Sequence, residues 1–175
     1  GAANVLALAQ LIMACRLKVR LRVLIPAVEN SISSNAFRPG DILKSRSGKT
    51  VEIGNTDAEG RLILADALTL AVDDNPDLLI DMATLTGAAR VALGPELPPY
   101  FTDDETLASE LAIAADQVAD PLWRLPLWQG YDDELSSKVA DLSNVSSSAF
   151  AGAIIGGLFL KRFVKKNQRW AHLDI

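Results

Sequence analysis

The sequence has 175 residues, of which 49% are hydrophobic and 22% charged, a composition typical of a folded globular domain rather than a disordered chain. Its 22 acidic and 17 basic residues give a net charge of −5, which disfavours a protein that binds nucleic acid through the phosphate backbone. No signal peptide is recognisable, and the longest apolar run, residues 149–160, is too short and too glycine-rich to span a membrane.

The N-terminal region predicts a helix and a strand. Residues 2–16 are apolar on nearly every side and predict a buried helix. Cys15 lies in this pattern, where we expect a buried thiol, and a single cysteine fits a reducing compartment. Residues 20–28 predict a strand that is buried on both faces at its C-terminal end, and residues 29–40 predict a polar loop.

The next segments predict a hairpin followed by a loop and a helix. Residues 41–46 and 49–53 flank a Ser-Gly turn and predict the two strands of a hairpin. Residues 54–61 form a polar, glycine-bounded loop that leads into a helix over residues 62–72.

The rest of the chain continues this alternation of strands and helices. Its expected elements, in order, are a strand at 77–82, a turn at 84–87 with a short helix to Leu93, a helix at 105–119, a Pro-bounded segment at 121–127, a loop at 136–148, a helix at 150–164 and a strand at 169–174. Strands that alternate with helices predict an α/β fold, a three-layer αβα sandwich around a mixed, largely parallel sheet.

Three polar clusters follow predicted strands, and in open α/β sheets chemistry gathers at the carboxyl ends of the strands. The clusters are Glu29-Asn30, the group Asp57, Glu59 and Arg61, and the turn Thr84–Gly87. We therefore expect a site at this edge of the sheet.

Asp57 and Glu59 are two hard oxygen ligands one residue apart, a spacing that lets both carboxylates chelate or bridge divalent ions. Arg61 adds a permanently charged group suited to a carboxylate, a bound anion or a developing oxyanion. The alternative is that one carboxylate only caps the following helix while Arg61 is solvated. Composition alone leaves these two interpretations about even.

The octapeptide at residues 55–62, Asn-Thr-Asp-Ala-Glu-Gly-Arg-Leu, resembles the signature of the leucyl (cytosol) aminopeptidase family. Further collinear segments extend the resemblance over essentially the whole chain: residues 26–30, 38–41, 47–52, 65–68, 81–88 and 170–175. An eight-residue match with several companions in the right order is a highly specific signal.

The resemblance implies that Asp57 and Glu59 are metal ligands, with Glu59 bridging two divalent ions, Mn²⁺ or Zn²⁺ with Mg²⁺ as a third candidate. It implies that Arg61 is catalytic, holding a bicarbonate anion that acts as general base and stabilising the transition state. It further implies two-metal activation of water. Thr84 and Leu85 match residues beside the peptide substrate, and Gly87 matches a residue that lines the side-chain pocket.

The chain also departs from the family pattern. A Lys and an Asp ligand and a second catalytic Lys lie upstream of the matched region in the family, a further Asp ligand lies just before the segment that Gly1-Ala2-Ala3 resembles, and more of the substrate pocket follows the position of Ile175. We therefore expect residues 1–175 to be part of a C-terminal catalytic domain, incomplete at both ends. We predict that this piece alone binds metal weakly and has no peptidase turnover.

The family resemblance implies a cytoplasmic metalloaminopeptidase that releases leucine and other N-terminal residues from peptides. We expect a hexameric parent enzyme with no membrane partner. The alternative is a non-catalytic scaffold or binding paralogue, which the intact Asp57, Glu59 and Arg61 disfavour. We expect the only histidine, His172, to be structural, and Gly152 and Gly156 to permit close helix packing.

Overall fold

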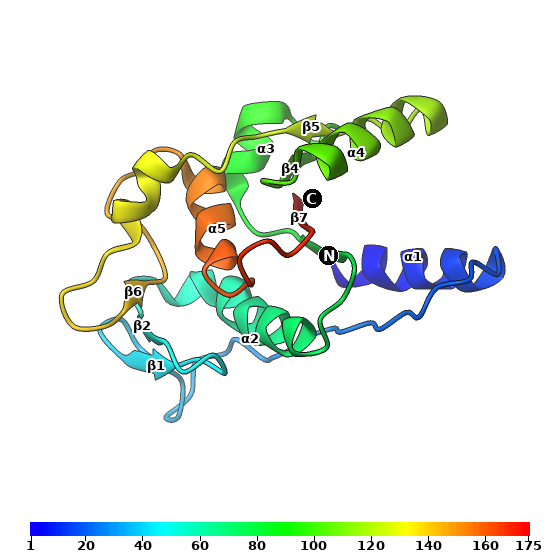
Figure 1. Cartoon of the computed structure of the whole chain (residues 1–175). Helices are drawn as coiled ribbons and strands as arrows, with labels where there is room; N and C mark the ends of the chain where they lie inside the picture. Colours follow the sequence, from blue (N-terminus) through cyan, green and yellow to red (C-terminus); the bar gives the residue numbers. More distant parts are fainter.

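The computed structural model describes all 175 residues and places a mixed sheet between two layers of helices (Figure 1). The helices are α1 (Ala2–Ala14), α2 (Glu59–Asp73), α3 (Gly87–Leu93), α4 (Glu105–Val118) and α5 (Gly152–Lys161), with two 3-10 helices, η1 (Thr56–Ala58) and η2 (Gln129–Leu135). The strands are β1 (Ile42–Lys44), β2 (Thr50–Glu52), β3 (Leu79–Ala83), β4 (Pro99–Phe101), β5 (Trp123–Arg124), β6 (Leu142–Ser143) and β7 (Trp170–Asp174).

The central sheet has the strand order β3-β7-β4-β5. Strands β3 and β7 are parallel, β7 and β4 are antiparallel, and β4 and β5 are parallel. The register pairs Asp81 with His172 and Ala83 with Asp174, so the carboxyl ends of β3 and β7 lie side by side. The predicted α/β sandwich around a mixed sheet is confirmed.

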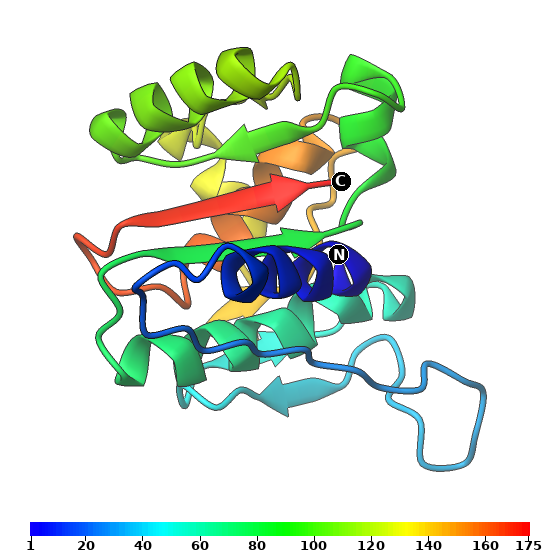
Figure 2. The same cartoon turned by 90° about the vertical axis from the view of Figure 1, so that its right-hand side faces the viewer.

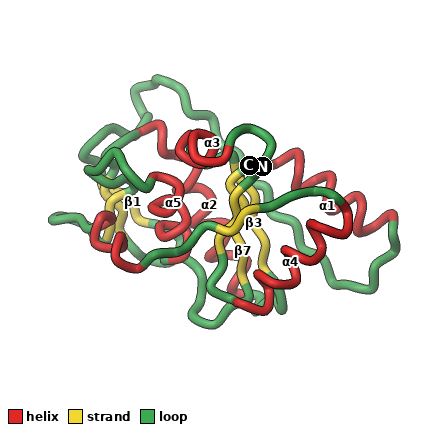
Figure 3. The backbone as a smooth tube through the Cα atoms, turned by 90° about the horizontal axis from the view of Figure 1, so that it is seen from above, coloured by secondary structure: helices red, strands yellow, loops and turns green.

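Seen from above, α1 and α4 lie on one side of the central strands and α2, α3 and α5 on the other (Figure 3). Side chains alternate between the two faces of a strand. On β7, Trp170 joins the larger core that α2 and α5 build, whereas Ala171 and Leu173 join a smaller core that includes Leu107 of α4. Each face of the sheet therefore has its own apolar layer.

A second, smaller sheet has the order β1-β2-β6. Strands β1 and β2 form the predicted antiparallel hairpin, with Gly48 at φ +88° in its turn, and β6 pairs with β2 in parallel. This parallel pairing brings the segment after Leu142 alongside the segment after Glu52, which leads directly into the loop that carries Asp57.

The predicted strand at residues 20–28 is wrong, because that segment runs extended past α2 without pairing to another strand (Figure 2). Its apolar side chains are half-buried or exposed. The predicted helix at residues 2–16 is present as α1, but only Ala9 is buried and Cys15 is exposed. Burial requires neighbours on several sides, and the main contact of α1 with the sheet is along β3.

The two ends of the chain lie close together at the carboxyl ends of β3 and β7 (Figures 2 and 3). The Gly1 backbone packs so tightly there that an added Cβ would collide with backbone atoms of Met82 and Ala83. None of the helices combines the length and apolar character that crossing a membrane requires.

Candidate metal and substrate site

The loop that carries the acidic pair is a single turn of 3-10 helix that runs into α2. Asn55 precedes η1, and its Oδ1 accepts a hydrogen bond from the Asp57 amide at 2.9 Å. Asp57 lies within η1 and Glu59 begins α2, whose N-cap residue Ala58 receives no side-chain hydrogen bond. Neither carboxylate caps α2, so the capping interpretation of this pair is wrong.

The two carboxylates lie in different surroundings. Asp57 is exposed, whereas Glu59 is half-buried and its Oε2 is enclosed without a hydrogen-bond partner. A buried carboxylate oxygen without a partner is costly, and a divalent cation is a ligand that would satisfy it. The donor set therefore fits part of a divalent-metal site, although no third His, Cys, Asp or Glu joins this pair to complete one.

Arg61 is buried rather than solvated, with 8% of its surface exposed. Its Nη1 donates to the Asn144 carbonyl oxygen at 2.8 Å, its guanidinium lies 5.9 Å from the Phe159 ring centroid, and its Nε has no partner. Burial lowers the pKa of Arg61, while the negative charge of Asp174 raises it. The side chain is therefore a fixed cation that makes a single hydrogen bond within the chain and encloses an unpartnered Nε.

Asp174 organises the second predicted cluster, the turn at Thr84–Gly87. Its Oδ1 accepts hydrogen bonds from the backbone amides of Leu85 at 2.8 Å and Thr86 at 3.1 Å, and its Oδ2 accepts one from Thr86 Oγ1 at 2.6 Å. Thr86 in turn caps α3 by accepting from the Ala89 amide. The buried carboxylate thus fixes the backbone of the turn.

Helix α5 joins the two clusters at Gly156. A Cβ at this position would lie 3.1 Å from Thr86 Cγ2, 3.2 Å from Leu85 Cδ2 and 3.9 Å from Arg61 Nη2. Arg61 and Leu85 therefore converge on one point of the helix. The close packing expected for the helix glycines is confirmed, since Gly152 similarly approaches Ala88.

The other predicted site residues make fewer contacts with the loop that carries Asp57 and Glu59. Thr84 and Gly87 are exposed, and the Thr84 hydroxyl makes no hydrogen bond to the loop at residues 55–61. From the first cluster, Asn30 reaches that loop and donates to the Thr56 carbonyl oxygen at 3.2 Å. The structure thus brings parts of all three polar clusters to one end of the molecule.

Two residues important to this geometry were not assigned a role from the sequence: Asn144 and Asp174. Asp174 ends a predicted strand, so the rule that polar groups after strands form sites would have identified it. Asn144 carries no comparable local signal, because its partners lie about 90 positions away in the sequence.

His172 is structural, as expected. It is fully buried, its Nδ1 lies 2.6 Å from Asp81 Oδ1, and its ring stacks on Phe101 with centroids 5.7 Å apart. Trp170 Nε1 donates to the other carboxylate oxygen of Asp81 at 2.7 Å. The group joins strands β3 and β7 within the core.

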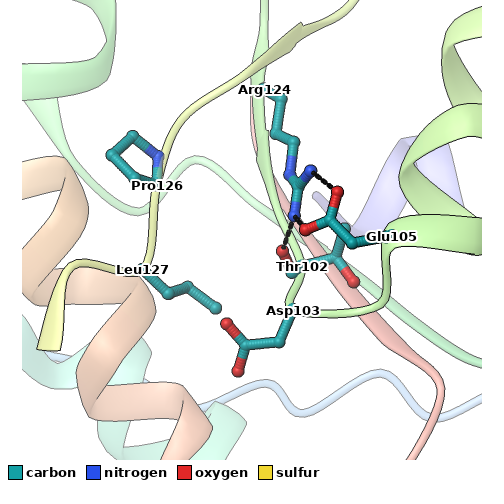
Figure 4. A pocket seen from close by; sticks show the side chains of 6 residues that line it. All are labelled: Thr102, Asp103, Glu105, Arg124, Pro126 and Leu127. Carbon is teal, nitrogen blue, oxygen red and sulfur yellow. Dashed lines mark hydrogen bonds and ion pairs between the residues drawn. The ribbon is translucent and has the colours of Figure 1, made fainter.

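The surface hollow in Figure 4, about 400 Å³ in volume, shares no residue with the candidate site. Its arginine is fully engaged, since Arg124 donates to both carboxylate oxygens of Glu105 at 2.7 Å and to the Thr102 carbonyl at 2.8 Å. These bonds raise the pKa of Arg124 and lower that of Glu105. The hollow therefore offers no unpaired arginine to a ligand.

A model of the family described as "Cytosol aminopeptidase family, catalytic domain" matches residues 1–175. The chain is 51% identical over 175 residues to a probable cytosol aminopeptidase of Xanthomonas axonopodis pv. citri (strain 306), covering all of this chain and 35% of that protein. A protein of the same description from Xylella fastidiosa (strain M12) is 54% identical over 160 residues, which cover 91% of this chain and 32% of that protein. The chain spans about a third of the length of these relatives.

Solved structures agree with the sequence comparisons. A crystal structure of a cytosol aminopeptidase from Coxiella burnetii aligns with a TM-score of 0.97 and 57% identity, over all of this chain and 38% of that one. A tomato leucine aminopeptidase carrying the mutation K354E aligns with a TM-score of 0.82 and 49% identity, over 85% of this chain and 29% of that one.

Proposed function

This chain belongs to the cytosol aminopeptidase family of metal-dependent peptidases, and on that premise we propose that residues 1–175 form part of a C-terminal catalytic domain. The full-length enzyme would release leucine and other N-terminal amino acids from peptides in the cytoplasm. The observation that carries the proposal is the buried, unpartnered Oε2 of Glu59, set between the exposed Asp57 and the buried Arg61.

Asp57 and Glu59 would hold two divalent ions in part, with Glu59 as the shared ligand. Carboxylate oxygens accept Mn²⁺, Zn²⁺ or Mg²⁺, and we propose Mn²⁺ or Zn²⁺ as the native ions. When bound, such a pair of ions polarises the scissile carbonyl and makes the attacking water more acidic. The α2 N-terminus, where Glu59 lies, fixes the carboxylate relative to Arg61 two residues along.

Arg61 would bind the bicarbonate anion and offset negative charge that develops on the substrate carbonyl oxygen. Its hydrogen bond to the Asn144 carbonyl and its packing near Phe159 hold the guanidinium before substrate arrives. Donors fixed in advance stabilise a transition state without reorganising during the reaction. Neither Nε nor Nη2 makes a hydrogen bond within the chain, so both would be donors for the anion.

Thr84, Leu85 and Gly87 would contact the substrate through the turn that follows β3. Backbone carbonyls of this turn would receive the peptide's groups, and Gly87 would leave space for the N-terminal side chain. The hydrogen bonds from Leu85 and Thr86 to Asp174 hold the turn in place. A turn ordered in advance lowers the entropy cost of orienting the substrate.

The remaining ligands, a Lys and two Asp, and the second catalytic Lys would come from residues upstream of Gly1. The position of Gly1 against Met82 and Ala83 supports this, because residues joined to it would arrive at the same end of the sheet. We therefore propose that the 175-residue piece alone binds metal weakly and turns over no peptide. We also propose that the full-length enzyme assembles as a hexamer.

The test is hydrolysis of leucine p-nitroanilide, with added Mn²⁺ or Zn²⁺, by the full-length polypeptide, its Glu59→Gln variant and the isolated 175-residue piece. We expect turnover only by the unmodified full-length enzyme, because the variant lacks the shared ligand and the piece lacks the upstream ligands. A folded full-length polypeptide that binds metal but hydrolyses no peptide would favour the scaffold alternative. Turnover by the isolated piece would refute the proposed division of the site.

A further inference from the structure

We propose that Asn144 is the positioning residue of the metal and anion site, holding the loop that carries Asp57 and Glu59 with its side chain and Arg61 with its backbone. The inference rests on the function proposed above. Asn144 follows β6, is fully buried, and lies more than 80 positions along the chain from each of these partners.

The side chain of Asn144 bonds only to the backbone of that loop. Its Oδ1 accepts hydrogen bonds from the amides of Gly54 at 2.8 Å and Asn55 at 3.3 Å. Its Nδ2 donates to the carbonyl oxygens of Asn55 at 2.8 Å and Ala58 at 3.5 Å. These four contacts enclose both ends of the short segment in which Asp57 lies.

The backbone of Asn144 connects the same loop to the sheet and to the arginine. Its amide donates to the Glu52 carbonyl oxygen at 2.9 Å, which continues the pairing of β6 with β2. Its carbonyl oxygen accepts the 2.8 Å hydrogen bond from Arg61 Nη1. Asn144 therefore forms hydrogen bonds to the acidic loop, to Arg61 and to the smaller sheet at the same time.

The chemistry of the contacts explains why this position needs an asparagine. A short side-chain amide offers an acceptor and a donor in one plane, as two amides and two carbonyls of the loop require. Aspartate would set a carboxylate oxygen against the Asn55 carbonyl, and alanine would remove all four of these part-buried hydrogen bonds. Groups that orient metal ligands typically change metal affinity or activity by about 10- to 100-fold when they are removed.

The alternative is an ordinary core asparagine that stabilises the fold without affecting the site. Asp141 provides a matched control, because it lies on the same segment and its Oδ2 accepts hydrogen bonds from Thr50 N at 2.7 Å and Thr50 Oγ1 at 2.8 Å. Asp141→Ala removes contacts between the same two segments but leaves the loop at residues 54–61 untouched.

The experiment compares Asn144→Ser and Asn144→Ala with Asp141→Ala in the full-length polypeptide. The readouts are the Mn²⁺ dissociation constant by calorimetry and, separately, kcat and KM for leucine p-nitroanilide. We expect the Asn144 variants to weaken Mn²⁺ binding and lower kcat by about 10-fold or more while KM changes less. Asp141→Ala should leave all three quantities near their wild-type values.

Folded Asn144 variants with wild-type Mn²⁺ affinity would overturn the inference, as would equal losses in Asp141→Ala. If neither Asn144 variant folds, hydrogen–deuterium exchange of residues 54–58 in the wild-type protein tests whether the loop is held in place. Protection of these amides from exchange supports the proposal that Asn144 holds the loop, and exchange at the rate of an unstructured peptide refutes it. A wild-type polypeptide that binds Mn²⁺ without turnover would refute the proposed function alone, because Mn²⁺ affinity still tests Asn144.

Discussion

Replacing Gly156 with alanine should reduce catalysis by crowding the point where Arg61 and the Leu85-Thr86 turn meet. The new Cβ would lie 3.1 Å from Thr86 Cγ2 and 3.2 Å from Leu85 Cδ2, a few tenths of an ångström closer than an ordinary contact. Leu85 can change its rotamer, but Thr86 is held by Asp174 through its hydroxyl. The crowding must therefore move the turn itself.

The magnitude follows from two opposing effects. Gly→Ala within a helix stabilises it by about 1 kcal/mol, whereas an extra methyl group in a well-packed region costs about 1–3 kcal/mol. We therefore expect the free energy of unfolding to fall by about 0–2 kcal/mol. If about 1.4 kcal/mol of strain enters the transition state, kcat/KM for a leucine anilide falls about tenfold.

The neighbouring Gly157 is a matched control for this variant. Its added Cβ would meet Leu127 Cδ2 at 3.0 Å and Phe101 carbon atoms at 3.3 Å, so it is at least as crowded but faces the core. Urea denaturation and steady-state kinetics of both full-length variants separate the two effects. The reasoning is refuted if Gly156→Ala keeps wild-type kcat/KM, or if Gly157→Ala loses as much activity at equal stability.

Two further predictions concern buried and surface carboxylates. Asp174→Asn should lower the free energy of unfolding by about 1–2 kcal/mol and reduce kcat/KM, because an NH2 donor replaces one of the two acceptor oxygens that hold the turn. Unchanged kinetics in a folded variant would contradict the role given to Asp174. Hydrogen bonds, chiefly from the backbone amides of Leu107 and Thr50, lower the pKa values of Asp104 and Asp141 below 3.8 in the folded chain. The unfolded chain then binds more protons in that range, so the free energy of unfolding should fall as the pH drops below about 4. Urea denaturation at several pH values between about pH 3 and pH 7 measures how steeply the free energy of unfolding depends on pH. Asp141→Asn should make this dependence shallower, and an unchanged dependence would contradict the prediction.

Much of the fold follows from local patterns. The hairpin was predictable because a Ser-Gly turn separates its two strands, and α3 was predictable because Thr86 is a strong N-cap residue. Helix α2 begins three residues earlier than predicted, at Glu59, because η1 passes directly into it. These elements depend on neighbours within a few positions, which is the range over which sequence periodicity is informative.

The elements that were missed depend on distant neighbours. Strand β4 has only three residues, and its pairing with β7 joins positions about 70 apart, so no local alternation marks it. The segment at residues 20–28 shows the opposite error, because a strand was predicted where none forms. Its apolar run has the composition of a buried strand, yet a strand also needs a partner for its backbone groups, and composition does not report whether one is present.

In the candidate site, the residues that carry the chemistry could be predicted from the sequence, whereas the residues that hold them in position were not. Asp57, Glu59 and Arg61 could be recognised because charge and spacing within seven residues are themselves the signal. Asn144 and Asp174 act by bonding to backbone groups about 90 positions away, and backbone groups are the same in every sequence. The position of Asp174 at the end of a strand marks it as a candidate, but the groups that it and Asn144 hold become visible only when the sheet register aligns β7 with β3 and β6 with β2. A variant that keeps Asp57, Glu59 and Arg61 but disrupts the pairing of β6 with β2 or β7 with β3 would keep every recognisable motif. It would nevertheless lose the relative positions of these side chains on which the site depends.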